Sequence, residues 1–197
     1  MDRTSPRSET DRRLDRFLRR FAYVRRTNVE TFAQRFAELL RAGAPPRDPR
    51  SLLPRIGITV ERGMVEPPAR GKRVRRGDGY AITVSEHEQR EAQAFAAWRE
   101  VFCLLAAQRG FPTELSQVGV ERLANRFATC ILMPADVMMA EAGRFSTNPD
   151  ALVEVLAQRF GVSLTAMRKR LYELEILRPR SRAVHLPQQG KATGSAK

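Results

Sequence analysis

The sequence contains few of the residues that bind metals or form disulfide bonds. Among its 197 residues are two cysteines and two histidines. Both cysteines, Cys103 and Cys130, have apolar neighbours, and two cysteines cannot supply the disulfide framework of a small secreted protein. We therefore expect them to be buried free thiols.

Long apolar runs are lacking as well. No stretch approaches the roughly 18 apolar residues that a membrane-spanning helix needs. The N-terminus is rich in arginine, but no apolar segment of the signal-peptide type follows it. These features predict a cytoplasmic protein with no membrane partner.

Basic residues are in clear excess. There are 35 Lys and Arg against 22 Asp and Glu, which gives a formal net charge of +13 and a pI near 11.1. Such an excess favours an anionic partner, with nucleic acid first and an acidic protein second. The competing explanation is the arginine-rich composition that accompanies GC-rich genomes, together with the share of this charge that lies in the tails.

Apolar residues recur at helical spacing through most of the chain. Two amphipathic helices are predicted before residue 41, and two longer helices at about 85–108 and 117–133. Runs rich in β-branched residues predict strands at 57–62 and 80–84. We expect an α+β fold that is mostly helical, in which a small sheet packs against the two long helices.

Changes in composition divide the chain into four parts. Residues 1–10 and 178–197 are polar tails that we expect to be disordered. The main domain is predicted to span residues 11–148. Residues 149–177 form a pair of short helices with a glycine turn at Gly161, a pattern typical of a helix-turn-helix.

Two groups of residues are candidates for contact with nucleic acid. One is a basic loop containing Pro and Gly at 66–77, and the other is the exposed face of the second helix of the C-terminal pair. The candidates are Arg70, Lys72, Arg73, Arg75, Arg76, Thr165, Arg168 and Lys169. The competing interpretations are a solvated loop and a helix pair that serves only for packing.

Two sequence stretches carry a resemblance to a known family. Residues 121–134 read Glu-Arg-Leu-Ala-Asn-Arg-Phe-Ala-Thr-Cys-Ile-Leu-Met-Pro, and residues 160–163 read Phe-Gly-Val-Ser. Together with a long preceding helix at 95–105, this order resembles the ImmA/IrrE family of zinc-dependent endopeptidases over about residues 30–177. The resemblance implies a zincin-like fold and a regulatory role, because members cleave or inactivate helix-turn-helix repressors.

The chain departs from this family at the zinc site. The family has His-Glu-x-x-His on the long helix, where two histidines one turn apart bind zinc and the glutamate polarises water. The matching positions are Arg99-Glu100-Val101-Phe102-Cys103, and Glu121 stands where the resemblance places a third ligand. Because the chain departs from the family at these positions, we expect that it has lost zinc and that no catalytic residue remains.

The two histidines of the chain are badly placed to replace the missing ligands. His87 lies about 24 Å before Cys103 if both belong to one helix with a rise of about 1.5 Å per residue. His185 lies in the C-terminal tail. Cys103 could bind zinc as a thiolate, but the permanent charge of Arg99 would repel the ion.

Arg99 offers a substitute for the positive charge of the metal. We hypothesise that its guanidinium pairs with Glu121 or Glu100, because an unpaired buried charge is costly. The alternative is that both glutamates are ordinary surface residues on charged helices.

Three functions remain open from the sequence. The first is a catalytically inactive member, a pseudoenzyme that binds a protein partner, namely a helix-turn-helix repressor, with DNA as a further partner. The second is a DNA-binding transcriptional regulator acting through residues 150–172. The third is an active metallo-endopeptidase with an unusual site built from Glu100, Cys103 and Glu121.

Overall fold

The computed structural model describes residues 8–144 and 148–177. Helix α1 (Glu9–Leu18) begins inside the predicted N-terminal tail. The Ser8 side chain accepts a hydrogen bond from the Asp11 backbone N–H, and the Asp11 carboxylate accepts one from the Ser8 backbone N–H, so a capping box begins the helix. This corrects the expected disorder for residues 8–10, while the predicted C-terminal tail at 178–197 lies outside the described residues.

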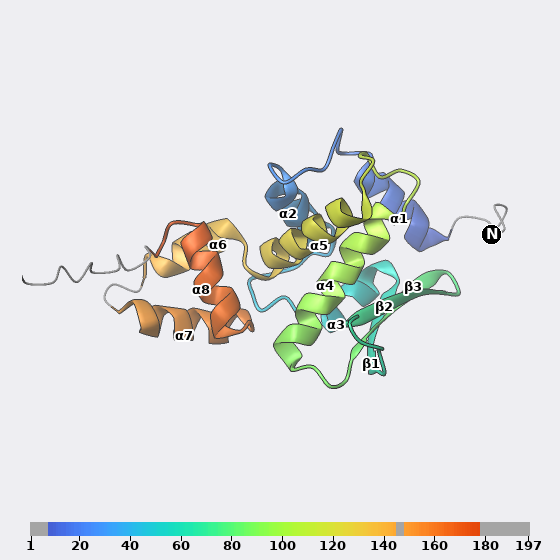
Figure 1. Cartoon of the computed structure of the whole chain (residues 1–197). Coiled ribbons are helices and arrows are strands. Elements are labelled where there is room, and N and C mark those ends of the chain that lie inside the picture. Colours follow the sequence, from blue (N-terminus) through green and yellow to red (C-terminus); the bar gives the residue numbers. More distant parts are fainter. Residues whose placement is uncertain (1–7, 145–147, 178–197) are drawn as a thin grey trace, which may run out of the picture.

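The core of the main domain is a cluster of phenylalanines contributed by four helices. These are α1, α2 (Val29–Leu39), α4 (Arg90–Ala106) and α5 (Gln117–Leu132). The ring centroids of Phe17 and Phe32 are 5.1 Å apart, those of Phe32 and Phe127 5.9 Å, and those of Phe102 and Phe127 5.5 Å. Tilted aromatic pairs at this spacing stabilise a core beyond their buried area alone. The cluster therefore fixes the position of α4 relative to α5, and Figure 1 shows the two helices side by side.

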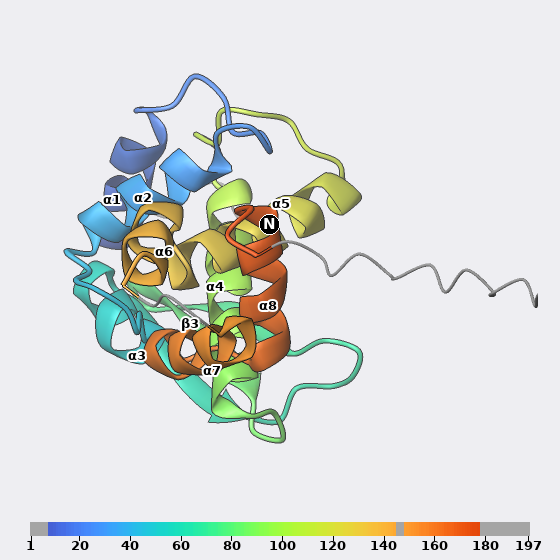
Figure 2. The same cartoon turned by 90° about the vertical axis from the view of Figure 1, so that its left-hand side faces the viewer.

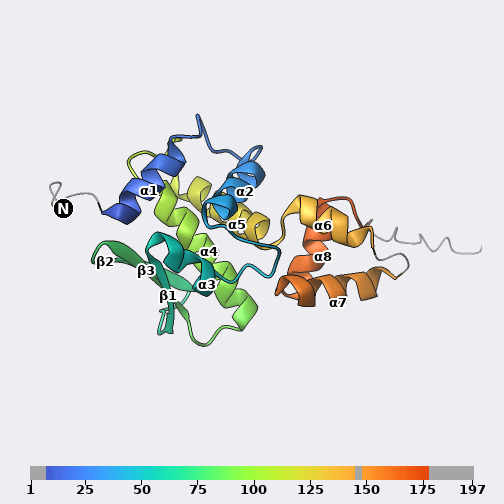
Figure 3. The same cartoon turned by 180° about the vertical axis from the view of Figure 1, so that it is seen from behind.

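A three-stranded sheet packs against α4, as Figures 1 and 3 show from opposite sides. Its strands are β1 (Ile58–Gly63), β2 (Gly71–Arg76) and β3 (Gly79–Ser85), and it is preceded by α3 (Pro49–Leu52) and the 3-10 turn η1 (Leu53–Ile56). The spatial order is β1-β3-β2, with β1 parallel and β2 antiparallel to β3. The predicted α+β fold is confirmed.

The basic segment that was expected to be a loop forms strand β2. It pairs with β3 along its whole length, and Gly77, at φ +57°, lies in the turn between them. Only Gly71 of the strand is partly shielded, and the remaining residues are exposed. An edge strand can carry successive charged residues, which explains why the apolar alternation of an ordinary strand is missing.

The C-terminal helices form a second lobe that crosses the end of the main domain (Figures 1 and 2). They are α6 (Ala135–Ala142), α7 (Pro149–Phe160) and α8 (Leu164–Glu173). Helix α6 thus lies with the C-terminal pair and not in the main domain predicted at 11–148, so we use the term main domain for the elements from α1 to α5. Gly161 ends α7 in the left-handed conformation, at φ +64°, and the Ser163 side chain caps α8 by accepting from the Ala166 backbone.

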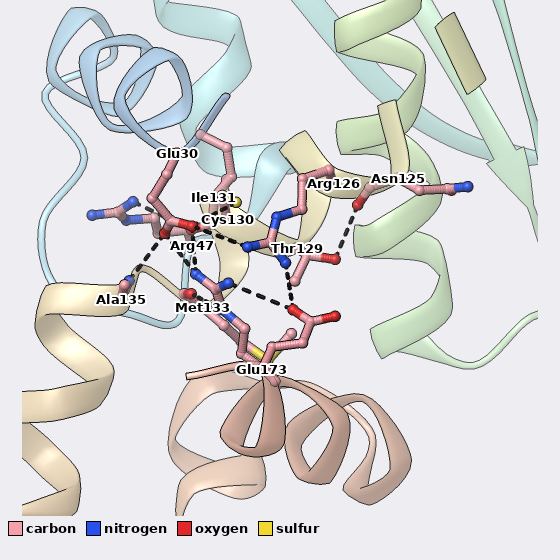
Figure 4. Close-up of polar contacts among 11 residues, drawn as sticks. Glu30, Arg47, Asn125, Arg126, Thr129, Cys130, Ile131, Met133, Ala135 and Glu173 are labelled. Atoms are coloured by element: carbon pink, nitrogen blue, oxygen red, sulfur yellow. Dashed lines mark hydrogen bonds and ion pairs between the residues drawn. The ribbon is translucent and has the colours of Figure 1, made fainter. Parts of the chain in front are cut away.

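A buried arginine, Arg170, joins this lobe to the main domain, and its partners Glu30, Met133 and Glu173 are labelled in Figure 4. The Arg170 side chain is fully buried, and its Nη2 donates to both carboxylate oxygens of Glu30 at 2.6 and 2.7 Å. Its Nε donates to the Met133 carbonyl at 3.0 Å. Glu30 also accepts from the Cys130 thiol at 3.0 Å and from the Ala135 backbone at 3.1 Å. Helices α2, α5, α6 and α8 thus meet at one carboxylate.

The charge state of this junction follows from these contacts. Burial raises the pKa of Glu30, but the hydrogen bonds from Cys130 and Arg170 and the charge of Arg170 outweigh it, so the pKa lies below the ordinary value. Glu30 is therefore ionised at neutral pH and neutralises Arg170.

We predict that Arg170→Ala destabilises the protein by about 3 kcal/mol, because it leaves Glu30 without its main partner and removes a buried side chain. Arg168→Ala is the matched control on the same helix, since its 2.9 Å pair with Asp150 is exposed and surface pairs contribute about 0–1 kcal/mol. Urea denaturation followed by circular dichroism measures both changes. Equal losses in the two variants would contradict the importance of the buried junction.

Candidate functional site

The residues that the resemblance matches to the zinc positions lie on two helices that pack against each other: Arg99, Glu100 and Cys103 on α4, and Glu121 on α5. We call Arg99, Glu100, Cys103 and Glu121 the degenerate site. Burial raises the pKa of the Cys103 thiol most, and the charges of Glu100, Arg99 and Glu121 make smaller contributions. The phenylalanine core that fixes α4 against α5 brings them together.

Glu100 is held by an arginine from the sheet. It is 9% exposed, and its Oε2 accepts a hydrogen bond of 2.6 Å from Arg73 Nη1 on β2. The strand passes so closely over α4 that a Cβ added at Gly71 would lie 3.0 Å from Glu100 Cγ. The Glu100 carboxylate, at the position that the resemblance matches to the family's general base, therefore already forms an ion pair with Arg73.

The hypothesis that Arg99 pairs with Glu100 or Glu121 is wrong. No hydrogen bond or ion pair joins Arg99 to either residue in the part of the chain that the structure describes, and its buried Nε has no hydrogen-bond partner. Glu100 has Arg73 instead, while Glu121 is exposed and accepts a 3.2 Å hydrogen bond from Gln117. An exposed carboxylate is stabilised by water, which removes the need for an arginine partner.

The two cysteines are free, and both have raised pKa values. Burial raises the pKa of Cys103, and the negative charge of Glu100 raises it further against the smaller opposing effects of Arg73 and Arg99. Burial together with the hydrogen bond to Glu30 raises the pKa of Cys130 to about 12. Both thiols are therefore protonated at neutral pH, whereas zinc binds the thiolate.

These donors do not fit a zinc ion. The degenerate site offers an ion-paired carboxylate, a protonated thiol, a solvated carboxylate and a permanent cation. Across residues 8–144 and 148–177, no three His, Cys, Asp or Glu side chains are grouped so that they could hold a metal. His87 is exposed in the turn before α4, and His185 lies outside the described residues.

Most of the basic candidates on and beside β2 have acidic partners. The pairs are Arg70–Glu88 at 3.3 Å, Arg73–Glu100 at 2.6 Å, Arg75–Asp11 at 3.0 Å and Arg76–Glu61 at 3.0 Å. Lys72 is exposed beside them. These ion pairs neutralise much of the positive charge that the sequence suggested for this segment.

The candidates on α8 lie on its exposed side. Thr165, Arg168 and Lys169 are all exposed, whereas Met167 and Leu171 are buried in the core. Arg168 pairs with Asp150 of α7. Lys169 faces a groove that it shares with Arg122 and Arg126 of α5. This groove could not be predicted from the sequence, because its residues come from segments far apart in the chain.

The mostly helical fold with a small mixed sheet agrees with what a comparison with protein families finds. The IrrE N-terminal-like domain family matches residues 55–172, more than half of the chain, and the protein belongs to this family. The predicted family is thereby confirmed. Helix α4 and the degenerate site both fall within the matched region.

The fold is also similar to a solved structure described as a Mycobacterium tuberculosis transcriptional regulator. The TM-score is 0.53 at 22% identity, over 87% of this chain and 54% of that one. The protein therefore spans about half the length of the regulator, and the likeness concerns the fold. No curated protein matches the chain. None of the described helices has the length and apolar character to cross a lipid bilayer.

We predict that Cys103 in the native protein is alkylated by iodoacetamide more slowly than a free cysteine at pH 8, because burial and Glu100 keep it protonated. Glu100→Gln should accelerate the reaction, since it removes the neighbouring negative charge and leaves the positive charge of Arg73. Peptide mapping by mass spectrometry separates Cys103 from Cys130, which serves as the internal control. A slower reaction in Glu100→Gln would be inconsistent with the described electrostatics.

Proposed function

We propose that the protein is a non-catalytic regulator of the IrrE-like family that acts by binding a partner. The observation that carries this proposal is the 2.6 Å ion pair between Arg73 and Glu100. A general base must have its carboxylate free to accept a proton from the attacking water, whereas the Glu100 carboxylate already accepts a hydrogen bond from the Arg73 guanidinium. Arg99 adds a second cation at a position where the family has a ligand.

The proposed partner is a helix-turn-helix repressor. Support comes from membership of the IrrE-like family and from the regulator whose fold is similar. A peptidase scaffold that has lost its metal can retain the surface that recognises its former substrate. The two free thiols fit a reducing compartment, so we place this activity in the cytoplasm.

Metal content tests the proposal. We expect the purified native protein to contain far less than one zinc per chain by elemental analysis, because the donors do not fit the ion. The double variant R99H/C103H rebuilds the two missing ligands beside Glu121, and we expect it to bind about one zinc per chain.

Glu121→Ala provides the control in both backgrounds. It should remove zinc from the double variant and change nothing in the native protein. One zinc per native chain that is lost on Glu121→Ala, together with chelator-sensitive cleavage of a repressor, would establish the alternative of an active metallo-endopeptidase.

A second candidate function is DNA binding through α7 and α8. The observation that favours it is the geometry of the pair, in which a left-handed Gly161 separates two capped helices and α8 exposes Thr165, Arg168 and Lys169. Leu164 and Tyr172 are also exposed, at 52% and 40%. A helix that presents these side chains could enter a major groove or contact phosphates.

If this second function holds, duplex DNA should bind with an affinity that falls as salt rises, because phosphate contacts release counterions. Arg168→Ala and Lys169→Ala should each weaken binding and reduce the salt dependence by about one charge. Fluorescence anisotropy at several salt concentrations measures both effects. Arg35→Ala on α2, in an exposed pair with Glu38, is the control outside the helix pair.

A further inference from the structure

We propose that the groove between α5 and α8 binds a small organic anion that also has an apolar part. The groove has a volume of about 860 Å³ and lies where the C-terminal lobe meets the main domain. Its basic residues are Arg25, Arg26, Arg122, Arg126, Lys169 and Arg170. This inference concerns a site separate from the degenerate site and does not depend on the function proposed above.

The positive charge of the α5–α8 groove is only partly neutralised. Glu173 is the one acidic residue among those that line it. Within the described ranges, no acidic side chain pairs with Arg26, Arg122 or Lys169. Three cations from three separate segments therefore line one concave space, and none of these three cations has an acidic partner in the described part of the chain. Such an arrangement concentrates anions, because low-dielectric walls focus the field.

Part of the groove's lining is apolar, and we call this part the floor. It consists of Val24, Phe95, Leu115, Leu123 and Met133. Sites for small molecules are commonly concave, of about 300–1,000 Å³, and mostly apolar with a few converging polar groups. The α5–α8 groove has this combination, so an anionic group would lie among the cations while an attached apolar body covers the floor.

One buried hydrogen-bond donor at the groove, a guanidinium nitrogen of Arg170, lacks a hydrogen-bond partner among the described residues. Arg170 Nη1 is buried, makes no hydrogen bond, and lies 3.6 Å from a carboxylate oxygen of Glu173. Glu173 also pairs with Arg126, so its carboxylate bridges the two arginines (Figure 4). A ligand carboxylate, sulfonate or phosphate that displaced Glu173 would meet both guanidinium groups, which are well suited to oxyanions.

The shape favours a small molecule over duplex DNA. The phosphates of a duplex lie on a convex cylinder and would reach only the rim of a concave groove, leaving the apolar floor uncovered. A compact amphiphilic anion covers the floor and the cations together. Because the groove is lined by α4, α5 and α8, such a ligand would also contact both lobes.

The test uses 8-anilinonaphthalene-1-sulfonate, an aromatic body with one sulfonate, on the full-length protein. N-phenyl-1-naphthylamine, which has the same aromatic body and no charge, is the matched probe. We expect saturable binding of one sulfonate probe per folded chain, with affinity at least tenfold above that of the neutral probe. Energy transfer from the single tryptophan, Trp98 on α4, provides a second readout of binding.

The double variant Arg122→Ala/Lys169→Ala should weaken binding of the sulfonate probe about tenfold and leave the neutral probe unchanged. Glu173→Gln should strengthen it, because the competing carboxylate is neutralised. Arg35→Ala, a surface cation outside the groove, should have no effect, and thermal unfolding confirms that each variant is folded. Unchanged affinity in the double variant, or equal binding of the two probes, would overturn the proposal. A third outcome would also overturn it: duplex DNA displaces the sulfonate probe from the native protein, and the double variant no longer binds that DNA.

Discussion

The guanidinium of Arg170 is enclosed by protein and must be neutralised there, and this requirement fixes where the C-terminal helices lie. Glu30 supplies the charge from α2, and the Met133 carbonyl at the end of α5 accepts a further hydrogen bond. Both partners belong to the main domain, whereas Arg170 belongs to α8. A charge in a low-dielectric environment tolerates few alternative positions, because each alternative leaves it unpaired. If only hydrophobic contacts joined the lobe to the main domain, a shift of the lobe would cost less free energy.

The same principle explains the degenerate site. A carboxylate at position 100 is 9% exposed and needs a positive partner. A metal centre would supply one, and in this protein Arg73 on the edge strand supplies it. The charge that neutralises Glu100 therefore comes from the sheet. Arg99, which replaces a family ligand, plays no part in holding Glu100.

The sequence predicted the helices and the family correctly because their signals are local or ordered along the chain. Apolar spacing outlined α4, α5 and the C-terminal pair, and the glycine turn predicted at Gly161 is present, with the glycine in the left-handed conformation. It failed for β2, whose run of basic residues has no apolar alternation. It also failed for the partner of Glu100, because Arg73 reaches it only once β2 has paired with β3. The α5–α8 groove was unpredictable for the same reason, since four segments that lie far apart in the chain create it.

The close approach of Gly71 to Glu100 has a consequence for how the family can vary. An added Cβ would lie 3.0 Å from Glu100 Cγ and 3.5 Å from the Thr83 carbonyl, so a larger residue at position 71 requires the strand or the glutamate to shift. Such a shift would lengthen the contact with Arg73. Positions 71, 73 and 100 are therefore expected to covary among related sequences. Where a shorter or uncharged residue replaces the glutamate, position 71 can carry a larger side chain, and position 73 no longer needs a positive charge.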